Sequence, residues 1–155
     1  MGTKGQHSMT RVLKYIGILL FKLMGWKYEK LPEYWTGKHV VIGFPHTCNM
    51  DTFRAFTYMK IVEIKGHILV KKSWFFWPMS ILLKAVGGIA VDRGKSTKTV
   101  SFIAEEFKSR DTFIVSIVPE GTRKKVTKIK TGFWYIAKEA DVSILCWHLD
   151  NKHKK

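Results

Sequence analysis

Cysteine is scarce in this sequence, with only Cys48 and Cys146 among 155 residues. Two free thiols in an intracellular protein are the simplest interpretation, and a disulfide between them stays an open alternative. Cys48 follows His46 by two positions, but no second cluster of cysteine and histidine completes the four ligands of a structural zinc site. We therefore expect no bound metal.

A secretory signal with a cleavage site is also lacking. Residues 10–26 have helical spacing, but their apolar centre is shorter than the roughly 20 residues that cross a bilayer unaided. Lys14 and Lys22 flank this centre and Trp26 follows it, which is typical of a helix lying among lipid headgroups. An amphipathic helix packed on the domain is the alternative, and both can hold at once.

The composition, 46% hydrophobic and 25% charged, is that of a globular protein without repeats or low-complexity tracts. Residues 1–9 are polar and unpatterned, so we expect a tag or a disordered leader before a native start at Met9. The remaining length suits a single domain at 10–155, with an N-terminal interfacial helix within 10–30.

Acidic residues are few, 12 against 27 lysines and arginines, which gives a formal net charge of +15. Such a surface attracts anions, whether nucleic acid, anionic lipid or an acidic carrier protein. Lysine suits diffuse attraction, whereas the planar fork of arginine suits specific recognition of phosphate. The chain has only five arginines: Arg11, Arg54, Arg93, Arg110 and Arg123.

Short apolar runs alternate with helical patterns along the chain. Strands are predicted at 39–45, 67–70, 89–91, 112–119 and 142–149. Helical spacing is found at 50–62, within 71–88, at 97–109 and at 131–140. The alternation predicts an α/β fold. Continuously apolar strands predict a central, mostly parallel or mixed sheet that helices cover on both faces.

Three polar clusters stand where strands stop, namely 46–51, 92–93 and 120–123. Ligands of open α/β sheets gather outside the strand ends, so these clusters are expected to converge. In the first, Asp51 can fix the tautomer of His46 and stabilise its imidazolium, leaving the other nitrogen to take a proton from a hydroxyl. A structural loop histidine and a helix cap are the alternative.

In the third cluster, Glu120 to Arg123, Gly121 allows the backbone to approach a ligand closely. Thr122 offers a hydroxyl and Arg123 a guanidinium to a phosphate. A β-turn with an ion pair between Glu120 and Arg123 is the alternative. The second cluster, Asp92-Arg93, carries little information alone and can present Arg93 to an anion.

Taken in order, the motifs resemble the PlsC-like glycerolipid acyltransferase superfamily, which includes the lysophosphatidic acid (1-acyl-sn-glycerol-3-phosphate) acyltransferases. Its histidine-x4-aspartate block matches His46 to Asp51, and its Gly-apolar-Asp-Arg block matches residues 88–93. Its Glu-Gly-Thr-Arg block matches 120–123, preceded by the usual proline. Its Lys-x-Gly helix and apolar strand match residues within 130–147.

The chain departs from the family pattern in three places. Pro45 and Cys48 stand where asparagine and serine are common, and Val142-Ser143 stands where a proline is common. The chain also ends soon after the fourth block, where relatives usually continue. It is therefore a shortened chain, a minimal natural member, or a protein that completes its sheet by association.

The resemblance implies transfer of a fatty acyl group from coenzyme A or acyl carrier protein to a glycerol-phosphate or lysophosphatidate hydroxyl in phospholipid biosynthesis. His46 is then the general base and Asp51 its orienting partner, with no cofactor. The acceptor phosphate is expected to contact residues of the second and third blocks: Arg93, Glu120, Gly121, Thr122 and Arg123.

An apolar groove is needed for the acyl chain, and an aromatic-rich segment supplies candidates: Trp74, Phe75, Phe76, Trp77, Ile81, Leu82 and Leu83. They can instead dip into a membrane or pack in the core. Together with the positive charge, they predict a peripheral protein at the cytoplasmic face of an anionic membrane, with no nucleic-acid partner. A basic nucleic-acid-binding module and a non-catalytic lipid-binding module remain alternatives.

Overall fold

A computed structural model of the chain describes residues 3–32, 35, 37–43, 49–92, 94, 96–122, 126–148 and 150–154. The strands are β1 (Lys38–Gly43), β2 (Gly66–Lys71), β3 (Gly88–Val91), β4 (Phe113–Ile117) and β5 (Ser143–Trp147). They form one sheet in the order β3-β2-β4-β1-β5, and each pair of neighbours is parallel. The expected α/β fold is confirmed, and its sheet is parallel throughout these strands.

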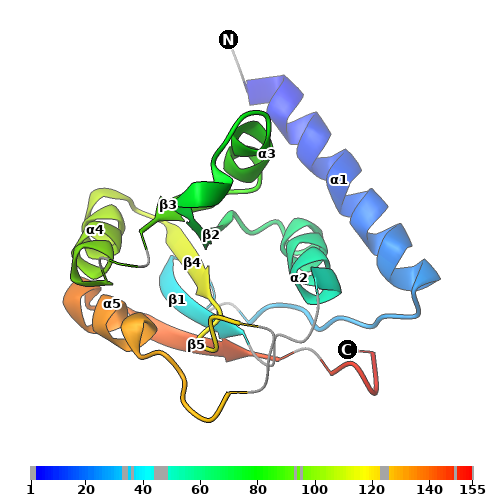
Figure 1. The fold of residues 1–155 in the computed structure, drawn as a ribbon. Coiled ribbons are helices and arrows are strands. Elements are labelled where there is room, and N and C mark those ends of the chain that lie inside the picture. Colours follow the sequence, from blue (N-terminus) through cyan, green and yellow to red (C-terminus); the bar gives the residue numbers. More distant parts are fainter. Residues whose placement is uncertain are drawn as a thin grey trace.

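The described helices are α1 (Thr3–Leu23), α2 (Asn49–Ile61), α3 (Met79–Ala85), α4 (Ser96–Ser109) and α5 (Gly132–Ala140), with a 3-10 turn η2 (Lys72–Trp74). The connections through α2 and α3 cross the sheet in one direction, and those through α4 and α5 cross it in the other. Because parallel crossovers are right-handed, the two pairs cover opposite faces, as Figure 1 shows.

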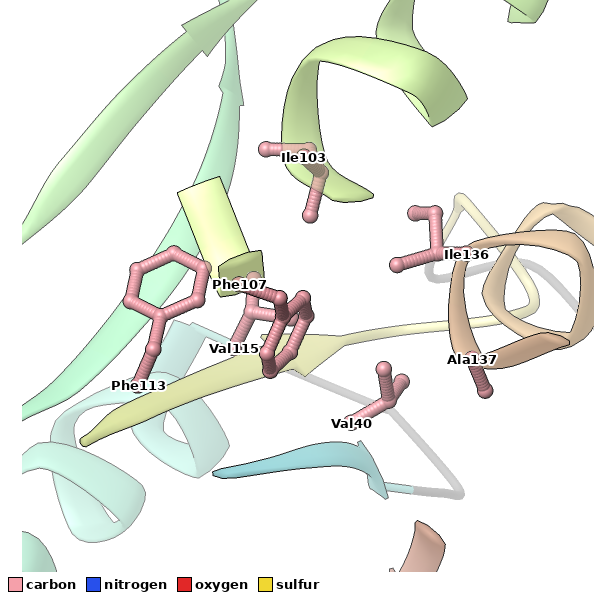
Figure 2. Packing of buried hydrophobic residues seen from close by; sticks show 7 residues of the cluster. All are labelled: Val40, Ile103, Phe107, Phe113, Val115, Ile136 and Ala137. Atoms are coloured by element: carbon pink, nitrogen blue, oxygen red, sulfur yellow. The ribbon is translucent and has the colours of Figure 1, made fainter. Parts of the chain in front are cut away.

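The main core lies between the sheet and the pair α4–α5. Phe113 and Val115 of β4 meet Ile103 and Phe107 of α4 there (Figure 2), each with an exposed fraction of 1% or less. Between them, Ile114 points to the other face and is also buried. The first three residues of this central strand, Phe113 to Val115, are therefore buried on both faces, which explains why all three are apolar.

Helix α1 packs against α2 through a second apolar cluster that contains Phe21, Trp26 and Ile61. Gly17 permits this approach, because a Cβ at that position would lie 3.0 Å from Ile61. The helix begins at Thr3 and so includes residues before the predicted helical stretch of residues 10–26. Among the described residues, no helix has both the length and the apolar content to cross a membrane.

The segment 71–88 contains a 3-10 turn, an aromatic stretch and then the short helix α3, which agrees with the helical spacing predicted within this range. After η2 the chain is irregular until Pro78, which precedes the first residue of α3. Proline favours this position because its ring would clash with the preceding turn inside a helix. The aromatic residues 75–77 consequently precede α3, and Gly87, at φ +79°, follows its end.

Candidate active site

Strands β1 and β4 lie side by side, and Ile42 near the end of β1 pairs with Ile117 at the end of β4. The chain leaves β1 for α2 on one face and leaves β4 for α5 on the other (Figure 1). Such a divergence opens a crevice outside the carboxyl ends of the strands. The first and third polar clusters follow these two strands, whereas Asp92 follows β3 at the sheet edge.

A cavity of about 710 Å³ lies at this end of the sheet. Its size falls within the roughly 300–1,000 Å³ of small-molecule sites. Residues of α2, η2, α4, α5 and all five strands contribute to its lining. The cavity therefore joins segments that are far apart in the sequence.

Some of the predicted site residues meet in this cavity: Asp51, Trp74, Gly121 and Thr122 line it. Asp92 of the second block lines it too. Other candidates are not part of the described lining: Phe75, Phe76, Trp77, Leu82 and Glu120. Trp77 is 81% exposed and Leu82 is 59% exposed, so both face solvent. His46, Arg93 and Arg123 lie outside the described residues.

Asp51 stands in the first turn of α2 with an exposed fraction of only 3%. Nη1 of Arg54, one turn further along the helix, donates to Oδ1 of Asp51 at 3.2 Å. The amino end of a helix favours a carboxylate, and the guanidinium favours it further. The cavity wall thus holds a negative charge in a fixed orientation.

The third block turns sharply at Gly121, whose φ is +62°. Its N–H donates to the carbonyl of Val118 at 3.1 Å, and the N–H of Lys130 donates to the carbonyl of Pro119 at 2.8 Å. A Cβ on Gly121 would come within 3.0 Å of Nζ of Lys130, so the glycine allows the ammonium group to approach the turn. Lys130 also lines the cavity and adds positive charge beside Thr122.

The described geometry thus places parts of the first, second and third sequence blocks around one cavity. A family model described as Acyltransferase matches residues 27–148, most of the chain. The chain belongs to the acyltransferase family. It therefore catalyses acyl transfer, the activity of that family. No curated protein and no solved structure matches it.

The acyltransferase has an apolar cavity wall that sequence reasoning did not single out. Ala55, Phe56 and Met59 of α2 face the cavity, and Ile68 and Val70 of β2 lie across from them. Their positions share one side of a helix and one face of a strand. That periodicity was visible in the sequence, but it does not distinguish a cavity wall from a filled core.

Trp147 of β5 lines the cavity of the acyltransferase beside β1, and its ring stacks on that of Tyr58. Trp147 and Tyr58 lie with ring centroids 6.4 Å apart and an interplanar angle of 10°. Burial raises the pKa of Tyr58, and its hydroxyl donates to the carbonyl of Glu29 at 3.1 Å. Gly43 is required here, since its Cβ would lie 2.3 Å from Nε1 of Trp147. The packing fixes the last residue of β1 before the segment that carries His46.

Two further observations concern metal and thiol chemistry in the acyltransferase. Within the described ranges, no three histidine, cysteine, aspartate or glutamate side chains gather where they could hold a metal ion. Cys146 on β5 is a free thiol, and Cys48 lies outside those ranges.

Proposed function

We propose that the protein transfers a fatty acyl group from a thioester of coenzyme A or acyl carrier protein to the hydroxyl of a glycerol-phosphate or lysophosphatidate-type acceptor in phospholipid biosynthesis. The observation that carries this proposal is one cavity in which Asp51, Gly121 and Thr122 share the lining with an apolar face of α2. Polar groups suit a phosphate-bearing acceptor, and the apolar wall suits a hydrocarbon chain.

In the proposed reaction, His46 is the general base. Asp51 accepts a hydrogen bond from one imidazole nitrogen, and the other nitrogen removes the proton of the acceptor hydroxyl. The oxygen then attacks the thioester carbonyl, the carbon–sulfur bond breaks, and the imidazolium returns the proton to the departing thiolate. The acceptor supplies the nucleophile, so no acyl-enzyme forms.

The acceptor phosphate is proposed to bind at the turn of the third block. Arg123 and Arg93 supply guanidinium groups, while Gly121 and Thr122 supply backbone and hydroxyl contacts and Glu120 positions the turn. The charge of Lys130, whose Nζ lies within reach of Gly121, supports an anion at this place.

The acyl chain is proposed to lie along the apolar wall formed by Phe56, Met59, Ile68 and Val70, with Trp74 at the same cavity. Each buried methylene would contribute about 0.8 kcal/mol. Trp77 and Leu82 face solvent instead and suit contact with a membrane.

Product analysis tests the proposal directly. The protein is incubated with a mixture of acyl-coenzyme A and acyl carrier protein thioesters and with glycerol phosphate, lysophosphatidate and a phosphate-free lipid alcohol. Mass spectrometry should then find acylated phosphate-bearing products. Free fatty acid alone would identify a thioesterase, and acylation of the phosphate-free alcohol alone would refute the phosphate site.

Arg123→Ala should raise the KM for the acceptor about 10- to 100-fold, because a charge-assisted contact to a phosphate contributes about 1.5–3 kcal/mol. Initial rates at varied acceptor concentration measure this effect. Arg110→Ala is the matched control: it removes the same charge from a residue just before β4, at the opposite end of that strand from the cavity. An acceptor KM that does not change in Arg123→Ala would refute the phosphate role.

Peripheral binding at the cytoplasmic face of an anionic membrane is part of the proposal. Apolar residues of α1 are exposed: Val12, Leu13, Tyr15, Ile16, Leu19 and Leu23. Sedimentation with phosphatidylserine-containing vesicles should show a bound fraction that falls as salt rises, since the screening length shrinks from about 10 Å at 0.1 M to about 3 Å at 1 M. Vesicles of neutral lipid are the control. An equal bound fraction at about 0.1 M and about 1 M salt would contradict the electrostatic contribution to membrane binding.

A further inference from the structure

Arg54 is a mostly buried arginine that the motif comparison does not use. It lies one turn after Asp51 on α2, and its side chain is only 18% exposed. Besides the 3.2 Å contact with Asp51, its Nη1 donates to Oδ1 of Asn151 at 2.9 Å, and its guanidinium carbon lies 4.5 Å from the ring centre of Trp26. Three segments of the chain therefore fix this one guanidinium.

Two of these contacts come from outside the residues that match the family model, which begin at 27 and end at 148. The segment that carries Asn151 is also held by contacts that do not involve Arg54. The N–H of Lys27 donates to the carbonyl of Lys154 at 2.7 Å. The carboxylate of Asp150 accepts the N–H of His153 at 2.9 Å and contacts Nδ1 of the same residue at 2.6 Å. These contacts lower the pKa of Asp150 to about 2.

The pairing of Arg54 is not optimal for stability alone. Its Nε is buried and has no hydrogen-bond partner among the residues that the structure describes. An unpaired buried donor on a charged group costs stability. The same guanidinium holds the carboxylate of Asp51 through Nη1, and this contact faces the candidate site.

We propose that Arg54 is a positioning residue for acyl transfer: it holds the Asp51 carboxylate in place and limits the negative charge that this carboxylate presents to the catalytic base. The inference rests on the proposed roles of His46 and Asp51. Asp51 thus has two partners, the guanidinium of Arg54 and the imidazole of His46. A carboxylate shared with a guanidinium stabilises an imidazolium less than an unshared one.

The test compares Arg54→Met, which removes the charge but keeps the length of the side chain, with Arg54→Lys, which keeps a charge. In Arg54→Met, kcat should fall about 10- to 100-fold, because a misplaced orienting group costs rate. The acidic limb of the kcat/KM profile against pH should move upward by on the order of 0.5–1 pH unit, since the imidazolium loses a nearby positive charge. The acceptor KM should stay within about twofold.

Arg54→Lys should restore the position of the acidic limb without restoring the full kcat. Besides Asp51, the charged side chains of the described lining are Lys71, Asp92 and Lys130, and both variants leave them unchanged. Asn151→Ala keeps the charge and removes one support of Arg54, so it should lower kcat with no shift of the acidic limb. It also keeps the proposal testable if Arg54→Met folds poorly.

An acidic limb that coincides in wild type, Arg54→Met and Arg54→Lys would overturn the proposal, as would activity lost only in proportion to the folded fraction. If Arg54→Met does not fold, full kcat in Asn151→Ala would overturn it. An inactive His46→Ala beside a wild-type-like Arg54→Met would reject the role of Arg54 alone. Wild-type turnover in His46→Ala would reject the base assignment and this inference with it.

Discussion

His46→Ala should abolish acyl transfer while the protein stays folded. A positioned general base contributes about 10²–10⁴-fold to rate, so kcat/KM should fall by at least two orders of magnitude. The expected loss is of this size because the acceptor hydroxyl is a poor nucleophile until its proton is removed. Thiol release from the acyl thioester measures turnover, and thermal unfolding measures the folded fraction in the same preparation.

Two further variants make this result specific. His148→Ala is the matched control, because His148 is an exposed histidine next to the end of β5. Asp51→Asn keeps the shape of the orienting side chain but removes its charge, so it should reduce kcat through the imidazolium. Wild-type-like turnover in His46→Ala would end the assignment of a catalytic base at this position.

The strand and helix periods of the sequence located the elements well, but they did not contain the order of the strands. Every strand except β3 has a spatial neighbour from which at least one other strand separates it in the sequence, as β1 is separated from β4 and β5. Period two in a strand identifies which side chains share a face, and it carries no information about the neighbouring strand. The handedness of the crossovers then places α2 and α3 on one face and α4 and α5 on the other.

Part of the candidate site was predictable for a related reason. Asp51, Gly121 and Thr122 follow strands that end at the same edge, so a general rule of α/β sheets brought them together. Arg54 is one of the five arginines of the chain, and no motif surrounds it. Its partners Trp26 and Asn151 are distant in the sequence, so no local pattern indicated its role. Long-range contacts of single side chains leave no period to detect.

Among the substitutions proposed for this protein, Phe107→Ala should destabilise the fold most. It should lower the free energy of unfolding by about 3–5 kcal/mol. Phe107 is 1% exposed and packs edge-on against Phe113 at a centroid distance of 4.7 Å (Figure 2). Truncation leaves a cavity between α4 and the central strand. Since domains are stable by only about 5–15 kcal/mol, this loss is a large fraction of the total. Urea unfolding followed by tryptophan fluorescence measures it.

Phe102→Ala on the same helix is the control, because that side chain is 44% exposed. Both substitutions change helix propensity equally, so the difference between them isolates the buried contacts. Equal destabilisation would refute the assignment of the core to this face of α4. Phe107 does not belong to the described cavity lining, so turnover per folded molecule should be preserved in Phe107→Ala. His46→Ala should give the reverse, a folded protein without turnover, and the two variants together separate stability from catalysis.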